Sequence, residues 1–137
     1  MATCLYSFLL YHAFILIKPL KYKSSGNIRG FKRFGVFLAH CVALNVISGV
    51  TVAGIDAGKV FNTWPSMNGK FLPDGYYRAE KGWKNMFENC ATVQFNHRCF
   101  AYLTYLTSLA MYCFYFNKAL PCRLRFAINL TFFLVNL

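Results

Sequence analysis

The fold is decided by residues 34–55, which read FGVFLAHCVALNVISGVTVAGI. These 22 residues include no charged side chain, and about 20 apolar residues are enough to cross the roughly 30 Å hydrocarbon core of a bilayer. We therefore expect a transmembrane helix here. Asn45, Gly49 and Ala53 recur at every fourth position, beside Ser48. Small and weakly polar residues let helices approach closely in lipid, so this stripe is predicted to pack against a neighbouring helix.

The composition supports a membrane protein. Of the 137 residues, 57% are hydrophobic and only 14% are charged, whereas soluble domains have about 45–50% apolar and about 25% charged residues. The net charge of +11 is then expected to mark loops on one side of the bilayer. The basic residues form no stripe interleaved with aromatic side chains, so nucleic acid is not an expected partner. Membrane lipid is.

Three other apolar runs predict further spans. Residues 91–117 form a complete span in which Arg98 is the only charged residue. Residues 2–17 are slightly short for a span, and residues 126–137 begin one without a closing charged flank. Since a half-span must be completed within the bilayer, we expect the chain to be a piece of a longer protein. The sequence thus predicts an all-α transmembrane helical bundle with two complete and two partial spans.

Loop charge predicts how the chain is oriented. Residues 18–33 hold six basic residues, and Lys118, Arg123 and Arg125 follow the span at 91–117. The loop at 56–90 holds five basic and four acidic residues. By the positive-inside rule, the first two segments face the cytoplasm or the matrix, and residues 56–90 form a loop on the outer side.

The outer loop contains signals for turns and for one short helix. Pro73-Asp74-Gly75 predicts a turn. After it, aromatic and apolar side chains fall on helical spacing and predict a short amphipathic helix at the membrane interface; they are Tyr76, Trp83, Met86 and Phe87. An ordered loop with scattered aromatic residues is the alternative.

His97 and Arg98 are the candidate site residues. His97 lies roughly 8–10 Å inside its predicted helix, at 1.5 Å per residue, and an ionisable residue at that depth suggests function. Neutral imidazole is a common axial ligand of haem iron; a hydrogen bond to a neighbouring helix is the alternative. Arg98 could contact a haem propionate or extend to the interface. For His12 and His40, an interhelical hydrogen bond is favoured.

The six cysteines form no C-x-x-C pair. Most fall in apolar runs, where free cysteine behaves as a small hydrophobic residue. Cys90 is the only cysteine in the outer loop, so an internal disulfide is excluded there. No nucleophilic triad, phosphate-binding loop or pair of carboxylates is present, so catalysis would require a metal or cofactor.

Four segments together resemble the haem A synthase family of mitochondria and alphaproteobacteria. They are AGIDAGKVFNTWPSMNG (53–69), FLPDG (71–75), MFEN (86–89) and TVQFNHR (92–98). The resemblance implies a fold of eight transmembrane helices in two related halves, each with a haem site made by two histidines. It places this chain in the C-terminal half, from the fourth helix to part of the seventh.

The resemblance also implies the site and the reaction. His97 would be an axial ligand of the haem b iron, and Arg98 a contact to the same haem. The partner histidine would lie beyond residue 137, and no catalytic residue would lie in this fragment, which alone would be inactive. The enzyme would oxidise the methyl group of haem O to the formyl group of haem A for cytochrome c oxidase, with an unidentified electron donor. A non-catalytic membrane haem-binding or oxidase-assembly protein is the alternative.

The expected location is the mitochondrial inner membrane, as a multi-pass protein, with the bacterial plasma membrane as the alternative. Some family members have a pair of cysteines in the outer loop, where Cys90 stands alone in this chain. Assembly into a homo-oligomer is left open.

Overall fold

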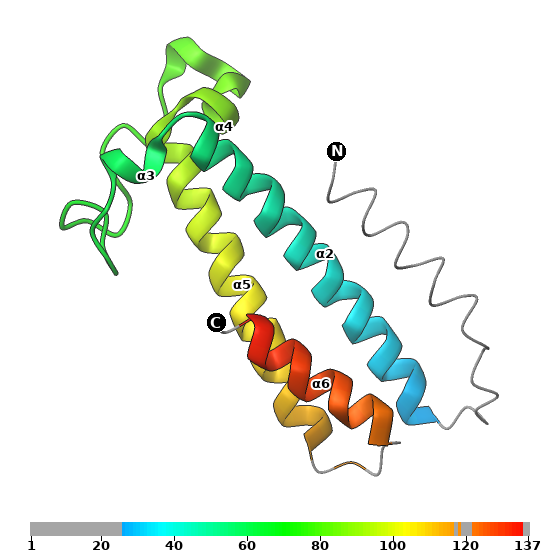
Figure 1. Ribbon diagram of the computed structural model, residues 1–137. Helices are drawn as coiled ribbons and strands as arrows, with labels where there is room; N and C mark the ends of the chain where they lie inside the picture. The colour runs from blue at the N-terminus through cyan, green and yellow to red at the C-terminus, as the bar shows by residue number, and fades with distance from the viewer. Residues whose placement is uncertain (1–25, 117, 119–121, 136–137) are drawn as a thin grey trace.

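The computed structural model describes residues 26–116, 118 and 122–135. Two long helices, α2 (Gly26–Gly54) and α5 (Cys90–Phe116), run antiparallel and side by side. The outer loop joins them at one end, and a shorter helix, α6 (Cys122–Val135), packs along the second half of α5 (Figure 1). The predicted span 2–17 and its His12 lie outside the described residues.

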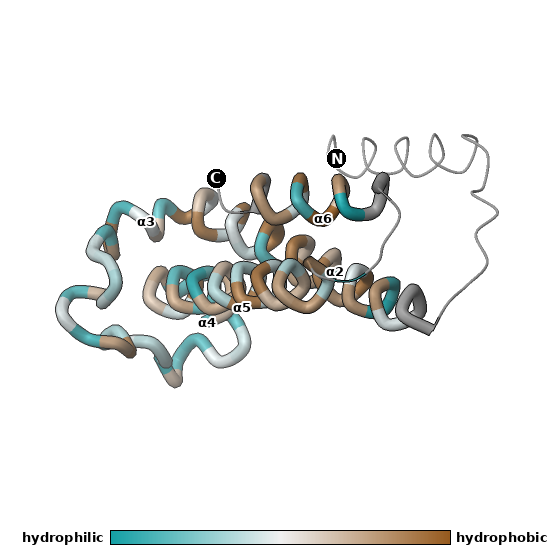
Figure 2. The backbone as a smooth tube through the Cα atoms, turned by 90° about the horizontal axis from the view of Figure 1, so that it is seen from below, coloured by the Kyte–Doolittle hydropathy of each residue, from teal (hydrophilic) through white to brown (hydrophobic). Residues whose placement is uncertain are grey.

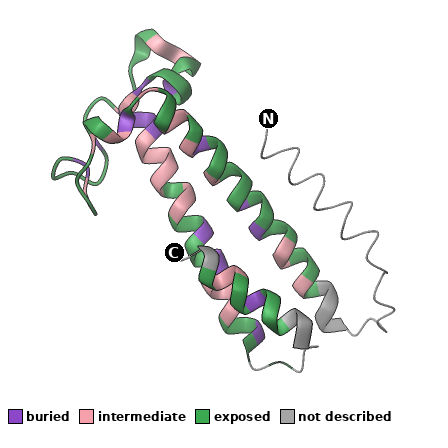
Figure 3. Cartoon of the chain, in the orientation of Figure 1, coloured by how far each residue is buried: buried purple, intermediate pink, exposed green. Residues whose placement is uncertain are grey.

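The described residues form helices and loops without a β-strand, which confirms the helical fold class. Residues 30–54 of α2 and the whole of α5 are long and apolar enough to cross a membrane. Figure 2 shows that hydrophobic residues dominate both helices and that hydrophilic ones gather in the connecting loop. Much of the apolar surface of α2 is exposed (Figure 3), including Phe37, Ile47 and Val50. Exposed apolar side chains are expected where a helix faces lipid.

α2 begins earlier than predicted, because residues 26–33 are helical and not part of a loop. This segment contains no proline, and its arginine and lysine residues are good helix formers. Lys32 and Arg33 are exposed, so the helix continues past its apolar part. α5 differs from the predicted span 91–117 by one residue at each end, and α6 begins at Cys122, before the predicted 126.

An apolar cluster joins the three long helices far from the outer loop. Leu38 of α2, Met111 and Tyr115 of α5, and Ile128 of α6 are its buried members. The Phe31 ring packs against the Tyr115 ring edge to face, with centroids 5.2 Å apart. Burying a side chain of this size stabilises a soluble fold by about 1.5–3 kcal/mol, but lipid offers no such gain and leaves close packing as the main term. The cluster therefore fixes how α2, α5 and α6 are packed.

The outer loop contains three short helices. α3 (Ala57–Val60) follows α2 directly, and η1 (Ala79–Lys84) leads into α4 (Asn85–Glu88). The predicted amphipathic helix is therefore a short 3-10 helix and a single α-helical turn. Gly82 breaks the 3-10 helix η1 itself with φ +50°, a conformation that glycine adopts without steric cost. The apolar side chains of the segment are nevertheless exposed, with Trp83 at 74% and Phe87 at 51%.

Two buried asparagines hold the second half of the loop together. The Asn85 side chain accepts a bond from the Arg78 N–H and donates to the carbonyls of Arg78 and Gly82, at 2.8–3.0 Å. Asn89 donates to the Gly75 carbonyl at 2.8 Å and to the Asn85 amide oxygen at 2.9 Å. Each residue is only 3% exposed. Because buried polar groups are costly when unpaired, this network ties the turns of the loop together.

Candidate functional site

His97 lies where α5 contacts α2. Its Nδ1 atom is 2.9 Å from the Ser48 hydroxyl oxygen. A Cβ atom placed on Gly49 would be 3.2 Å from Cε1 of the imidazole, so glycine allows the ring to lie against the backbone of α2. This is the stripe of small residues predicted to pack against a neighbour, and at Gly49 that neighbour is His97.

No hydrogen bond from the other ring nitrogen of His97, Nε2, is found to a described residue, although the Asn45 carbonyl also lies beside the ring. An imidazole held through Nδ1, with Nε2 unpaired, has the arrangement that metal-ligating histidines adopt. No group of three or more His, Cys, Asp and Glu side chains in the described residues could hold a bare metal ion. A haem needs fewer protein ligands, because its porphyrin supplies the equatorial nitrogens. The donor set at His97 therefore fits an axial ligand of haem.

Three positions on the face of α5 that carries His97 are covered. Val93, Thr104 and Ser108 are at most 4% exposed. The hydroxyl groups of Thr104 and Ser108 donate to carbonyls of α5 itself, at 2.8 Å. Small residues at these positions would leave room beside the imidazole only if they were uncovered, and the structure buries them. This face of α5 is therefore covered in the structure.

We expect the substitution Gly49→Val to displace the imidazole of His97. The added methyl groups would meet a ring that already stands 3.2 Å from the position of a Cβ atom, and overpacking of this kind costs about 1–3 kcal/mol. Thermal unfolding in detergent measures the effect. Gly35→Val is the matched control, since a Cβ atom on Gly35 meets nothing within 4 Å. Equal destabilisation by the two changes would show that the contact with His97 carries no weight.

Arg98 points away from His97 and holds the first half of the outer loop. One terminal nitrogen donates to the carbonyls of Thr63 at 2.7 Å and Phe61 at 3.0 Å. The other donates to the carbonyls of Pro65 and Ser66 at 3.3–3.4 Å. Neutral carbonyls satisfy the N–H donors but leave the positive charge without a counter-ion. No carboxylate among the described residues pairs with it.

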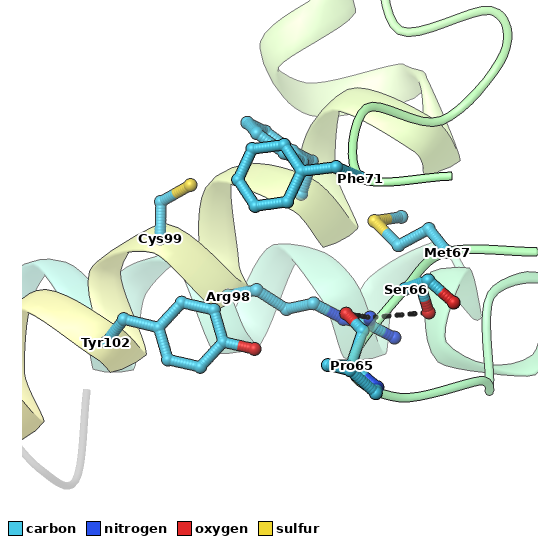
Figure 4. Close-up of a pocket in the computed structure, with 8 residues that line it drawn as sticks. Pro65, Ser66, Met67, Phe71, Arg98, Cys99 and Tyr102 are labelled. Carbon is cyan, nitrogen blue, oxygen red and sulfur yellow. Dashed lines mark hydrogen bonds between the residues drawn. The ribbon is translucent and has the colours of Figure 1, made fainter. Parts of the chain in front are cut away.

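A cleft of about 340 Å³ opens beside Arg98. Figure 4 shows the Arg98 side chain reaching from α5 toward Pro65 and Ser66, with Phe71, Tyr102 and the Cys99 thiol around the cleft. The walls are mostly apolar, and His97 does not line them. The structure therefore places the two predicted site residues on one turn of α5 but directs their side chains to different surroundings.

His40 differs from its prediction. Its Nδ1 atom is 2.7 Å from the carbonyl oxygen of Val36, one turn earlier on the same helix, and the residue is exposed. The expected interhelical hydrogen bond is therefore replaced by one within α2. A histidine can satisfy one ring nitrogen in this way without a partner helix, because the i−4 carbonyl lies within reach of its side chain.

Sequence reasoning missed the residues that fix the loop. Trp64 donates from its indole nitrogen to the Tyr102 hydroxyl at 3.1 Å, and Tyr76 donates to the Asn96 side chain at 3.2 Å. Pairing between loop and helix leaves no periodic pattern in the sequence. The one available signal was the density of Asn, Trp and Tyr in the segments that carry the resemblance.

Comparison with known proteins identifies the family. The family model described as cytochrome oxidase assembly protein matches residues 1–137. A haem A synthase of Bartonella bacilliformis is 40% identical over 101 residues, which cover 74% of this chain and 28% of that protein. A haem A synthase of Granulibacter bethesdensis is 42% identical over 108 residues, covering 79% of this chain and 28% of that protein. A third, from Bartonella tribocorum, is 46% identical over 88 residues, covering 64% and 24%.

The chain thus spans about a quarter of the length of the curated relatives it matches. No solved structure matches it. The family match covers the apolar helices and the outer loop alike, and the motif that contains His97 and Arg98 lies within it. The chain therefore belongs to the cytochrome oxidase assembly protein family, the family of these haem A synthase relatives.

Proposed function

We propose that this chain is part of a haem A synthase and contributes His97 as an axial ligand of a haem b. The observation that carries the proposal is the state of the imidazole. Nδ1 is bonded to Ser48 on the facing helix, and Nε2 has no partner among the described residues. The names of the relatives support a role in haem A biosynthesis. Any second protein ligand would come from outside α2 and α5.

The reaction proposed for the whole protein is the oxidation of the methyl group of haem O to the formyl group of haem A. A bound haem b would supply redox chemistry, with electrons from a donor that is not identified. The residues of this chain would bind and orient that group: His97 holds the iron-facing nitrogen in place, and the outer loop, fixed by Arg98 and the two asparagines, excludes water from the outer end. Membrane lipid surrounds α2 and α5, and self-association remains a prediction.

The membrane location follows from the family and from the two apolar helices. The finer location, the mitochondrial inner membrane, stays a prediction, and the relatives compared above are bacterial. Because the relatives are bacterial, the bacterial plasma membrane, which is the alternative named from the sequence, should be tested as well as the mitochondrial inner membrane.

The proposed reaction is tested by the haems that a cell accumulates. The full-length protein to which this chain belongs is expressed in bacteria that make haem O but lack a haem A synthase, and the extracted haems are separated by liquid chromatography. Haem A is expected to appear as haem O declines.

The description of the family as cytochrome oxidase assembly protein also favours a second function, a non-catalytic haem-binding assembly factor. Bound haem b in the purified protein, with no haem A in the cells, would select that function.

Arg98→Gln is expected to loosen the outer loop and to weaken haem binding. Hydrogen bonds from a charged group contribute about 1.5–3 kcal/mol, and Arg98 makes two shorter than 3.1 Å, to Phe61 and Thr63. Limited proteolysis of the loop measures the first effect, and haem content measures the second. Arg98→Lys is the matched variant, because it keeps the charge and loses the planar fork. If Arg98→Lys keeps full haem content while its loop is cut faster, charge is what the haem requires. Unchanged haem content in both variants would contradict the propionate contact.

A further inference from the structure

The hydroxyl group of Ser48 takes part in two hydrogen bonds but has one proton. It donates that proton to the Asn45 carbonyl at 2.9 Å, three residues earlier on α2. Serine residues within helices often make such a bond to the preceding turn. Since the proton is used there, the contact of 2.9 Å between Ser48 and the His97 ring requires Nδ1–H of the histidine as the donor.

The opposite assignment leaves more groups unsatisfied. If Ser48 donated to Nδ1, the imidazole proton would lie on Nε2, which has no acceptor among the described residues. The bond from Ser48 to Asn45 would also be lost. In a membrane-spanning segment, water is absent as a substitute partner, so each unpaired donor costs free energy. The Nδ1–H tautomer satisfies both hydroxyl contacts and leaves a lone pair on Nε2.

We propose that Ser48 is a positioning residue that fixes His97 as the Nδ1–H tautomer and thereby directs the Nε2 lone pair toward the haem iron. The proposal rests on the proposed function, in which His97 is the axial ligand. α2 supplies both constraints from consecutive residues: Ser48 binds the ring edge, and Gly49 lets the ring lie against the helix backbone. Ser48 is 9% exposed, so water competes little for the bond.

An acceptor on Nδ1–H makes the imidazole a stronger donor to iron, and loss of such a partner typically weakens metal binding by about 10- to 100-fold. In protein purified from membranes, Ser48→Ala is therefore expected to bind haem b less tightly by that factor. Its midpoint potential should rise, because a less electron-rich imidazole stabilises ferric iron less. The low-spin electron paramagnetic resonance signal should shift, since the ring is freer to rotate. Ser48→Thr keeps the hydroxyl and should restore all three properties toward wild type.

Thr51→Ala is the matched control. Thr51 also donates a hydroxyl bond to a carbonyl three residues earlier on α2, that of Ser48, at 2.6 Å, but it does not contact His97. It should leave potential and resonance signal unchanged. If Thr51→Ala shifts them as much as Ser48→Ala does, the effect belongs to the helix and the positioning role is wrong.

A measurement without haem tests the tautomer directly. In haem-free protein labelled with ¹⁵N histidine, His97 should show a protonated Nδ1 and an unprotonated Nε2, and the reverse pattern would overturn the proposal.

The variants distinguish the role of His97 as ligand from the role of Ser48 as positioning residue. If His97→Ala abolishes the haem signal and Ser48→Ala matches wild type in potential and resonance, the ligand stands and the positioning role falls. If His97→Ala keeps its full haem spectrum, both fall.

Discussion

Replacing His97 by alanine is expected to abolish the haem b signal of the purified protein. The change removes the only imidazole of α5 and leaves nothing at that position that can ligate iron. Ser48 and Gly49 would then face a small cavity. The absorption spectrum of the reduced protein and its haem-to-protein ratio measure the effect. Imidazole added to the buffer should restore part of the spectrum by occupying the space that the side chain leaves.

His40→Ala provides the matched control for this prediction. His40 lies on the facing helix, is exposed, and bonds the carbonyl of its own helix. Haem content should be unchanged in this variant. Retention of the complete haem b spectrum in His97→Ala would show that His97 is not the ligand. A loss of haem in both variants would point to general damage to the bundle.

The second large effect is expected from Asn85→Ala. The Asn85 amide makes bonds of 2.8–3.0 Å to the backbone of Arg78 and Gly82 and to Asn89. Each buried group left unpaired costs about 1–3 kcal/mol, so the loop should lose at least about 2 kcal/mol of stability. Hydrogen exchange at the amide of Arg78, or tryptic cleavage at Lys81, measures this local opening.

Asn62→Ala is the control for the loop. Asn62 is exposed, and its side chain makes no hydrogen bond to a described residue. It should leave exchange and cleavage unchanged. The helices α2 and α5 should also keep their thermal stability in Asn85→Ala, because the network binds the loop and not the apolar cluster at the other end. Cleavage of Asn85→Ala at the wild-type rate would mean that the network is not what holds the loop.

The parts of the fold that follow from hydrophobicity could be predicted from sequence. Residues 34–55 and 91–117 were expected as spans, and α2 and α5 cover nearly all of them. In a bilayer, backbone N–H and C=O groups must be hydrogen-bonded within the protein, and an apolar run of about 20 residues meets this requirement by forming a helix. The start of α2 was less predictable, because lysine and arginine are compatible both with a loop and with a helix that extends past the bilayer.

The site was predictable in its identity and less so in its surroundings. His97 was predicted as a site residue because an ionisable residue inside a span is costly. The small residues around Gly49 predicted a close helix contact. The partners of Arg98 could not be foreseen, since four backbone carbonyls of a loop have no signature in side-chain sequence. The break at Gly82 was missed because the apolar spacing around it fits a continuous helix.

His97 and Arg98 are consecutive residues, which an α-helix with 3.6 residues per turn separates by about 100°. One therefore contacts the neighbouring helix, and the other contacts the loop. A single peptide unit links them, so no side chain needs to relay motion between the two places. A small rotation of α5 about its axis would change both the Arg98 hydrogen bonds to the loop and the orientation of the imidazole. The loop contact and the imidazole are thus linked directly through the backbone of α5.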